Sequence, residues 1–348
     1  MAIDLTGGLP PERDHVFAER PGPDVRDAAN VWLEEENGEF AMRIGIEGLA
    51  EEWAAHEIWL DIAFPDGRVF SAREFGKSHP AIGPEGKPTI LGAGPLEFRC
   101  IEPFKHWSCT FSKHQVAELS AATLISEVYP DPPRLSEIAF GIDFYPVVPP
   151  LISGTLTAES VALMSGEQGT FLSPRFEQLC RAQGWLEIDG KRRDFKAQLL
   201  RIKRQGVRKF EGFWGHCWQS ALFPSGKAFG INVYPPRADG KPSFNEGFIF
   251  DGDGVLKPAR AVTMPWMKKL LTDGEDVPLV LETADGLVTI QGTTFINCFS
   301  RGGAGGKASN MLPASFPAVQ QAHATYTWDG ETATGMIERS TARDQVEF

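Results

Sequence analysis

The chain has 348 residues, a formal net charge of −12 and a sequence pI near 5.2. This acidity argues against nucleic acid or an anionic membrane surface as a partner, because both require a basic patch on the protein. The five cysteines are scattered without a C-x-x-C pair, which argues against a zinc site and predicts a reduced, cytoplasmic protein. No stretch is apolar and long enough to predict a signal peptide or a membrane span.

The first half of the chain has the pattern of an arm followed by hairpins. Residues 1 to about 28 are rich in proline, glycine and charge, and predict an extended arm or a segment across the end of a barrel. Asn37-Gly38 and Pro65-Asp66-Gly67 each separate two short runs of alternating apolar residues, which is typical of a β-hairpin. Further strands are expected at 96–115, 122–130 and 138–150. This pattern predicts an all-β protein.

A polar, glycine-containing string follows Pro149-Pro150 and predicts a linker between domains. Because 348 residues exceed what one hydrophobic core usually serves, we expect two consecutive antiparallel β domains, at 1–160 and 161–348. The second half repeats the strand-and-turn style, and only 264–274 has a plausible short helix. The sequence does not determine the oligomeric state, and a homo-oligomer is one possibility.

The residues from Glu211 to Pro235 hold the densest group of aromatic and titratable side chains, and turn at Pro224-Ser225-Gly226-Lys227. If Phe223 pairs with Ala228, alternation places one set of candidate ligand-binding residues opposite the apolar run 229–233 as an aromatic wall: Trp214, His216 and Trp218. The other face carries the remaining candidates of this hairpin, Gln219, Asn232 and Tyr234. The aromatic wall predicts a site for an apolar small molecule.

An internal echo links the two halves. Phe64-Pro65-Asp66-Gly67-Arg68 and Phe223-Pro224-Ser225-Gly226-Lys227 match in pattern, and Trp59 and Trp218 lie five residues before the respective phenylalanines. The match indicates two halves of similar architecture.

Four strings in this order carry a family resemblance: LEFRCIEPFKHWSCTF, RFEQLCRAQGWLEIDGKRRDF, the central hairpin and TYTWDGETATGMIE. Over most of its length the chain resembles the AttH and carotenoid 1,2-hydratase group of lipocalin-like proteins. The resemblance implies two consecutive lipocalin-like (calycin) β-barrels or half-barrels. It also implies relatives that act on large apolar molecules without a cofactor, by alkene hydration or ring-forming cycloaddition. The chain departs from the group between Arg208 and His216, where the Asp of an Arg-Asp-His-Ser-Trp-Gly string is missing and the His is displaced.

Hydration of an isolated alkene requires a proton donor and electron-rich walls. Asp143, flanked by Ile142 and Phe144, is the candidate catalytic acid if its side chain points inward, although alternation allows it to point outward. His216 is a candidate general base or hydrogen-bond donor, or a satisfied core histidine. Glu246 is a further candidate for ligand binding, with a solvated turn as the alternative.

No metal or cofactor is predicted. The histidines never pair at ligand spacing, and RGGAGGKAS at 301–309 lacks the spacing of a phosphate-binding loop, so we expect a flexible loop there. Two classes of function remain. One is a cofactor-free hydratase, isomerase or cyclase acting on a hydrophobic isoprenoid- or polyketide-like molecule; the other is a non-catalytic carrier of such a molecule.

Overall fold

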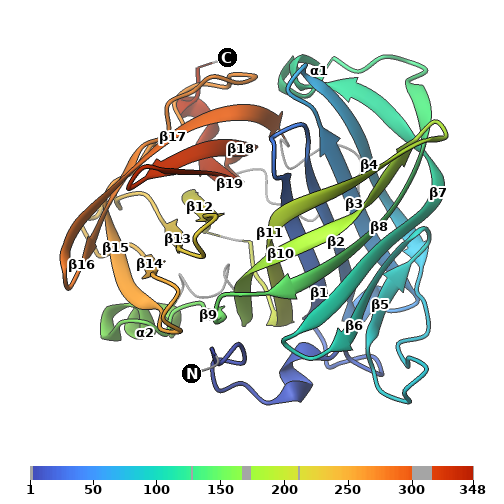
Figure 1. The fold of residues 1–348 in the computed structure, drawn as a ribbon, viewed down its shortest axis with the longest axis horizontal. Helices are drawn as coiled ribbons and strands as arrows, with labels where there is room; N and C mark the ends of the chain where they lie inside the picture. The colour runs from blue at the N-terminus through green and yellow to red at the C-terminus, as the bar shows by residue number, and fades with distance from the viewer. Residues whose placement is uncertain (1–2, 127, 167–173, 211, 300–315, 348) are drawn as a thin grey trace.

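The computed structural model describes residues 3–347 except 127, 167–173, 211 and 300–315, so the 301–309 loop lies outside the described residues. The chain forms two antiparallel β units that lie side by side (Figure 1). The first is a ring-like sheet and the second a closed barrel. The predicted all-β fold in two consecutive units is therefore confirmed.

The first unit is an 11-stranded sheet with the order β4-β3-β2-β1-β11-β10-β8-β7-β6-β5, and β9 pairs with β10. A short pairing between β4 and β7 closes the ring. Its strands are β1 (Val25–Glu35), β2 (Ala41–Leu49), β3 (Ala55–Ala63), β4 (Arg68–Lys77), β5 (Ile90–Ala93), β6 (Leu96–Glu102), β7 (His106–Ser120), β8 (Arg134–Pro146), β9 (Leu151–Ile152), β10 (Arg175–Ile188) and β11 (Lys191–Val207). The hairpins predicted at Asn37-Gly38 and Asp66-Gly67 join β1 to β2 and β3 to β4. Gly38 and Gly67 adopt the positive φ angles, 73° and 86°, that such turns need.

In the second unit each strand pairs with the next, and β19 returns to β12 to close the barrel. Its strands are β12 (His216–Leu222), β13 (Ala228–Val233), β14 (Asn245–Phe250), β15 (Lys257–Thr263), β16 (Leu279–Thr283), β17 (Gly286–Phe299), β18 (Ala318–Trp328) and β19 (Glu331–Thr341).

Helices are few and short among the described residues. They are α1 (Ala121–Ser126), α2 (Ala158–Met164) and the 3-10 turns Pro11–Asp14, Ala50–Glu52 and Arg343–Gln345. Two sequence predictions were wrong here: the strand expected at 122–130 begins within α1, and the segment 264–274 is irregular chain and not a helix. Among the described residues, no helix has the length and apolar character needed to cross a membrane.

The sheets change over between Val207 and His216, and not at residue 160. The hairpin of β10 and β11 belongs to the first sheet, because β10 pairs with β8 and β11 pairs with β1, as in Ala28 opposite Arg204. The expected division into 1–160 and 161–348 therefore does not coincide with the division between the sheets. The polar string after Pro150 instead contains α2 and leads from β9 back into the same sheet.

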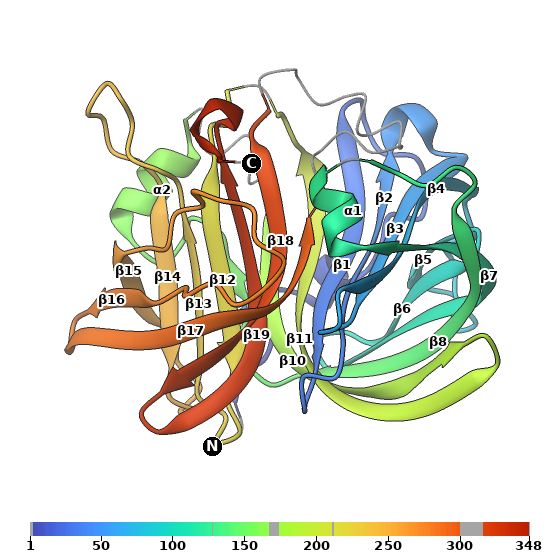
Figure 2. The ribbon, with the colours of Figure 1, turned by 90° about the horizontal axis from the view of Figure 1, so that it is seen from above.

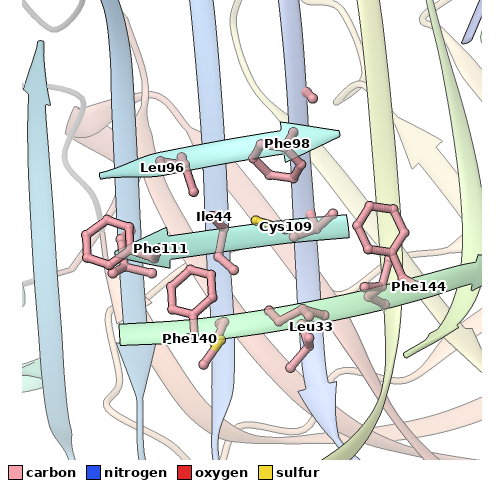
Figure 3. Packing of buried hydrophobic residues seen from close by; sticks show 14 of the residues in the cluster. Leu33, Ile44, Leu96, Phe98, Cys109, Phe111, Phe140 and Phe144 are labelled. Carbon is pink, nitrogen blue, oxygen red and sulfur yellow. The ribbon is translucent and has the colours of Figure 1, made fainter. Parts of the chain in front are cut away.

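Side chains fill the interior of the first unit. Apolar residues from β1, β2 and β6 to β8 pack in its centre (Figure 3), among them Leu33, Ile44, Phe98, Phe111 and Phe140. The N-terminal arm runs along one end of this unit and inserts Asp14, which is fully buried. Asp14 accepts hydrogen bonds from Trp107 Nε1 at 3.0 Å and Arg201 Nη1 at 2.9 Å. The expected segment across the barrel end is confirmed.

The barrel of the second unit is filled in the same way. Phe229, Ile231 and Tyr326 belong to its apolar core. Polar residues inside it are paired with one another, since Tyr326 Oη donates to Gln219 Oε1 at 2.9 Å and Arg339 binds Gln320 and Glu275. Buried side chains therefore occupy both interiors.

The two units pack against each other through the outer faces of their sheets. An apolar cluster joins them, with Trp32 and Leu200 from the first unit and Leu222, Phe248 and Met336 from the second. In the view of Figure 2 this seam runs between β10 and β11 on one side and β12 and β19 on the other. The same contact leaves the cavity described next.

Candidate ligand-binding cleft between the two units

The register of the central hairpin differs by one residue from the expected one. Leu222, and not Phe223, lies opposite Ala228, because Phe223 already belongs to the turn, where its N–H donates to the oxygen of Lys227 at 2.8 Å. A shift of one residue exchanges the two faces of the returning strand. Trp218 therefore lies opposite Asn232, and the prediction that it shares a face with the apolar run Phe229, Ile231 and Val233 is wrong.

The corrected register places His216 and Trp218 on the outer face of the second barrel, where they face the outer face of the first sheet. A cavity of about 160 Å³ lies between these faces. Residues of β1 to β4, β10 and β11 line one side, and residues of β12, β18 and β19 line the other. We refer to this space as the cleft. This volume is smaller than that of most pockets for drug-sized ligands, so a small ligand suits it best.

Three tryptophans line the cleft. Trp32 and Trp218 meet edge to face across the two units, with ring centroids 6.0 Å apart. Trp59 lies on the far side of Arg43, whose Cζ is 5.5 Å from the Trp32 ring and 5.3 Å from the Trp59 ring. Gly45 makes room for this arrangement, because a Cβ atom there would lie 2.2 Å from the Trp59 ring.

The internal echo of the sequence is reproduced in the structure. Phe64 and Phe223 each begin a turn with the same pair of backbone hydrogen bonds, and these turns join β3 to β4 and β12 to β13. Five residues before each turn, Trp59 and Trp218 both line the cleft. The similarity predicted between the halves is thus confirmed at these hairpins.

Glu57 on β3 is the carboxyl group that opens into the cleft from the first unit. Glu57 is only 3% exposed and lines the cleft. Burial raises the pKa of Glu57 to about 7, which Arg73 and Arg43 counteract and Glu47 reinforces. This side chain therefore exchanges a proton near neutral pH.

Glu338 on β19 faces the cleft from the second unit and is the opposite case. It lies 3.0 Å from His216 Nε2 and accepts a hydrogen bond from Gln321 Nε2 at 2.7 Å. Burial alone would raise its pKa, but the hydrogen bond and charge of His216, together with Arg43, lower it to about 2. Glu338 is thus an ionised acceptor beside His216 Nε2.

Five arginines line the cleft: Arg43, Arg73, Arg175, Arg204 and Arg208. Arg175 is paired, since its Nη2 lies 2.6 Å from Glu177 and its guanidinium stacks 5.1 Å from the Trp218 ring. Several buried polar atoms of the cleft have no hydrogen-bond partner among the described residues: Trp59 Nε1, Arg204 Nε and Gln321 Oε1. Buried polar groups are nearly always paired, so these atoms indicate a place for a ligand or water.

Two of the sequence candidates lie away from the cleft. The Asp143 side chain is 49% exposed on β8 and forms a surface pair with His106, whose Nε2 lies 2.7 Å away. It therefore points outward, which is the alternative that alternation allowed. Trp214 precedes β12, donates from Nε1 to the oxygen of Pro235 at 3.0 Å and packs edge to face on Tyr234.

The other candidates are built into the second unit. Gln219 points into the barrel, and Tyr234 packs against Phe213 and Phe244. Asn232 is buried beside Trp218, with no hydrogen-bond partner among the described residues, but does not line the cleft. Glu246 is 1% exposed, so the solvated turn is wrong, and it accepts from the N–H groups of Gly154 and Leu156 at 2.6 and 2.9 Å. Of all the candidates, only His216 and Trp218 meet in the cleft.

The sequence predictions missed Glu57, Trp32 and the arginines. A usable signal was present in the echo, because Trp59 matches Trp218 and Glu57 shares a strand face with Trp59. Larger surface grooves exist, such as one of about 570 Å³ lined by Tyr145, Arg181 and Lys196 among others and one of about 810 Å³ lined by Asp143, Trp185 and Asp194 among others. Most of their charged side chains are exposed or half-exposed, so the cleft is the better candidate. Within the described residues, no group of three or more His, Cys, Asp or Glu side chains is placed to hold a metal ion.

The fold and the cleft define a protein of two joined β units with a ligand-sized cavity at their junction. The chain belongs to the family of the domain of unknown function DUF7064, which matches residues 24–343. No curated protein matches the sequence.

Solved structures with similar folds are known. One is a provisionally assigned AttH from Nitrosomonas europaea, at 13% identity and a TM-score of 0.55, with 91% of this chain and 92% of that chain covered. A second is CghA, at 10% identity and a TM-score of 0.52, with 98% of this chain and 93% of that chain covered. A third is kievitone hydratase from Nectria haematococca, at 10% identity and a TM-score of 0.50, with 99% of this chain and 97% of that chain covered. These likenesses show a shared fold and confirm the resemblance to the AttH-like group.

Proposed function

We propose that the protein binds a hydrophobic isoprenoid- or polyketide-like small molecule in the cleft and transforms it by acid–base chemistry without a cofactor. The observation that carries this proposal is Glu57, a buried carboxyl with a pKa near 7 beside an aromatic wall. A group with this pKa can both donate and accept a proton at neutral pH, which is the requirement for general acid–base catalysis.

The charges of the cleft select the kind of transition state. Arg43 lies against the faces of Trp32 and Trp59, and five arginines line the cleft against two glutamates, Glu57 and Glu338. A cation about 5 Å from a guanidinium is opposed by about 3 kcal/mol at an effective dielectric constant of 20. Cation–π attraction returns only about 0.5–2 kcal/mol. The cleft therefore favours a developing negative charge over the carbocation that hydration of an isolated alkene requires.

A conjugated carbonyl compound meets this requirement. A proton moves between Glu57 and a carbon of the substrate, while Arg43 and Arg73 stabilise the charge that develops on the carbonyl oxygen. With water as nucleophile, oxygen bonds to the β-carbon, the water proton leaves to a base and Glu57 protonates the α-carbon, so the net change is addition of water. Without water, removal and return of a proton shifts the double bond. Hydratase and isomerase chemistry are thus two outcomes of one arrangement.

Binding is tested first, with β-ionone, an isoprenoid enone, titrated while tryptophan emission is followed. Trp218→Ala should weaken binding by about 1–3 kcal/mol, the usual loss for a buried aromatic anchor. Trp185→Ala is the matched control, because Trp185 lies elsewhere on β10 and does not line the cleft. Equal affinity in the two variants would place the ligand outside the cleft.

Chemistry is tested by incubating a panel of enones in deuterated water and following deuterium uptake and hydration by NMR. Glu57→Gln should lower the rate at least about a hundredfold, the lower range for general acid–base catalysis, with β-ionone binding retained. If no member of the panel reacts while binding persists, the non-catalytic carrier becomes the better description.

A further inference from the structure

One end of the cleft is formed by β10, β11 and the segment that follows β11. Arg175 and Arg204 are cross-strand partners on the outer face of the first sheet, and Arg208 and Phe210 follow them in the lining. Arg26 on the neighbouring strand β1 stacks over the same Phe210 ring, with its Cζ 5.0 Å from the centroid. Four guanidinium groups are thus gathered at this end.

Carboxylates of the chain offset part of this charge. Arg26 is held by Glu47 at 3.0 Å and Arg175 by Glu177 at 2.6 Å. Arg204 differs: it is 4% exposed, its Nε has no hydrogen-bond partner, and it takes part in no ion pair with any described residue. Arg339 shows what a satisfied buried arginine looks like here, because it binds Gln320, Glu275 and the oxygen of Pro265.

The surroundings of Arg204 disfavour its charge. Burial lowers the pKa of Arg204 well below its usual range, the neighbouring charges of Arg208 and Arg175 lower it further, and only Glu47 opposes them. A buried charge without a partner destabilises the folded protein. An uncompensated charge that opens into a cavity is explained if a ligand supplies the missing partner.

We propose that the ligand of the cleft carries a carboxylate, which is bound by Arg204 at this end while the apolar body extends along the tryptophans toward Glu57. The proposal rests on the proposed function and specifies its substrate class, an isoprenoid- or polyketide-like acid. A carboxylate fits because a planar guanidinium binds it with two parallel hydrogen bonds. Its single negative charge suits Arg204, for which the described residues supply no ion-pair partner.

The sheet also sets the length of the ligand. Glu57, Glu47, Ala28 and Arg204 are successive register partners across β3, β2, β1 and β11. Three strand spacings separate Glu57 from Arg204, roughly 14 Å between their Cα atoms. After both side chains are allowed for, the carboxylate at Arg204 lies several bonds from the conjugated carbonyl that reacts near Glu57, so the two are separate groups of the ligand.

Geranic acid and geraniol test the inference, because they share one apolar body and differ in carboxylate against hydroxyl. Calorimetric titration at pH 8 should show geranic acid binding about tenfold or more tightly than geraniol, as expected for a charge-assisted pair. Arg204→Met should reduce this preference to less than about threefold. Arg134→Met is the control for net charge, because Arg134 is 74% exposed on β8 and should leave the preference unchanged.

A second readout separates ligand recognition from a structural role. Without ligand, Arg204→Met should raise Tm by about 2–4 °C, because it removes an unpaired buried charge. A structural arginine would give a lower Tm. If Arg204→Met does not fold, Arg204 is structural and the inference fails. Arg204→Lys should fold and keep only part of the preference, because it retains the charge and loses the planar fork.

The outcomes are distinct. If geraniol binds as tightly as geranic acid, or if Arg204→Met keeps the preference, the carboxylate inference is overturned and the proposed function stands. If neither compound nor β-ionone binds, both proposals fail. Geranyl phosphate is a further arm, and binding much tighter than that of geranic acid would replace the carboxylate by a phosphate.

Discussion

Arg201 and Arg204 lie three residues apart on β11 and point to opposite faces of the same strand. Both are nearly inaccessible, at 3% and 4% exposure. Arg201, on the inner face, is held by Asp14 and Gln178, whereas Arg204, on the outer face, forms no ion pair with a described residue and its Nε has no hydrogen-bond partner among them. The comparison teaches that burial of a charge does not mark a binding site; the absence of its partner does.

A substitution at the ion pair on the inner face should cause the largest loss of stability. Asp14→Ala leaves Arg201 as an uncompensated buried charge and frees the arm, so the free energy of unfolding should fall by about 3–5 kcal/mol. Urea denaturation measures this loss. Glu12→Ala is the matched control, because Glu12 is exposed in the same 3-10 turn and should change stability by less than about 0.5 kcal/mol. Similar losses in both variants would show that the arm, and not the ion pair, is what matters.

Glu57 sharpens the comparison through pH. Its pKa in the folded protein, about 7, is higher than the ordinary value of 4.5, so between these values the folded state binds more protons than the unfolded state. Stability should therefore fall as the pH rises through this window, by up to about 3 kcal/mol, and stay low above it. Unfolding measured from pH 4 to 8 should show this slope in wild type and a flatter one in Glu57→Gln. An unchanged slope in that variant would show that Glu57 is not the group that titrates.

A substitution at Gly45 tests how tightly Trp59 is packed on the outer face of the first sheet, without a change of charge. Gly45→Ala would place a Cβ atom against the Trp59 ring, so stability should fall by about 1–3 kcal/mol and β-ionone binding should weaken. Gly22→Ala is the control, because a Cβ there meets no atom within 4 Å. Thermal unfolding and tryptophan emission give both readings. Equal behaviour of the two variants would show that Trp59 adjusts freely.

Local signals predicted the fold class and several hairpins correctly. The turns at Gly38 and Gly67 are encoded within a few residues, because their backbone conformations demand glycine. The division between the sheets is not encoded locally, since it depends on the pairing of β11 with β1 from the far end of the chain. The hairpin register was missed by one residue because nothing near Phe223 shows whether it ends a strand or begins a turn.

The site shows the same limit more sharply. Asp143 and Glu57 have a similar local pattern, because each carboxyl is next to an apolar residue that points into the first unit, Ile142 and Ile58 respectively. Asp143 lies at the surface, whereas Glu57 is buried, because the second unit covers the outer face of β3 and not that of β8. Alternation determines which face a residue occupies, and only the tertiary packing determines whether that face meets water.

The apolar cluster that joins the units has a consequence for how the protein unfolds. Leu222, Phe248 and Met336 of the barrel are covered by Trp32 and Leu200 of the first sheet. Separating the units would expose this surface to water, so neither half is expected to remain soluble when expressed alone. The two halves should instead lose structure together in one cooperative transition, and a chain cut between Val207 and His216 should stay assembled after proteolysis.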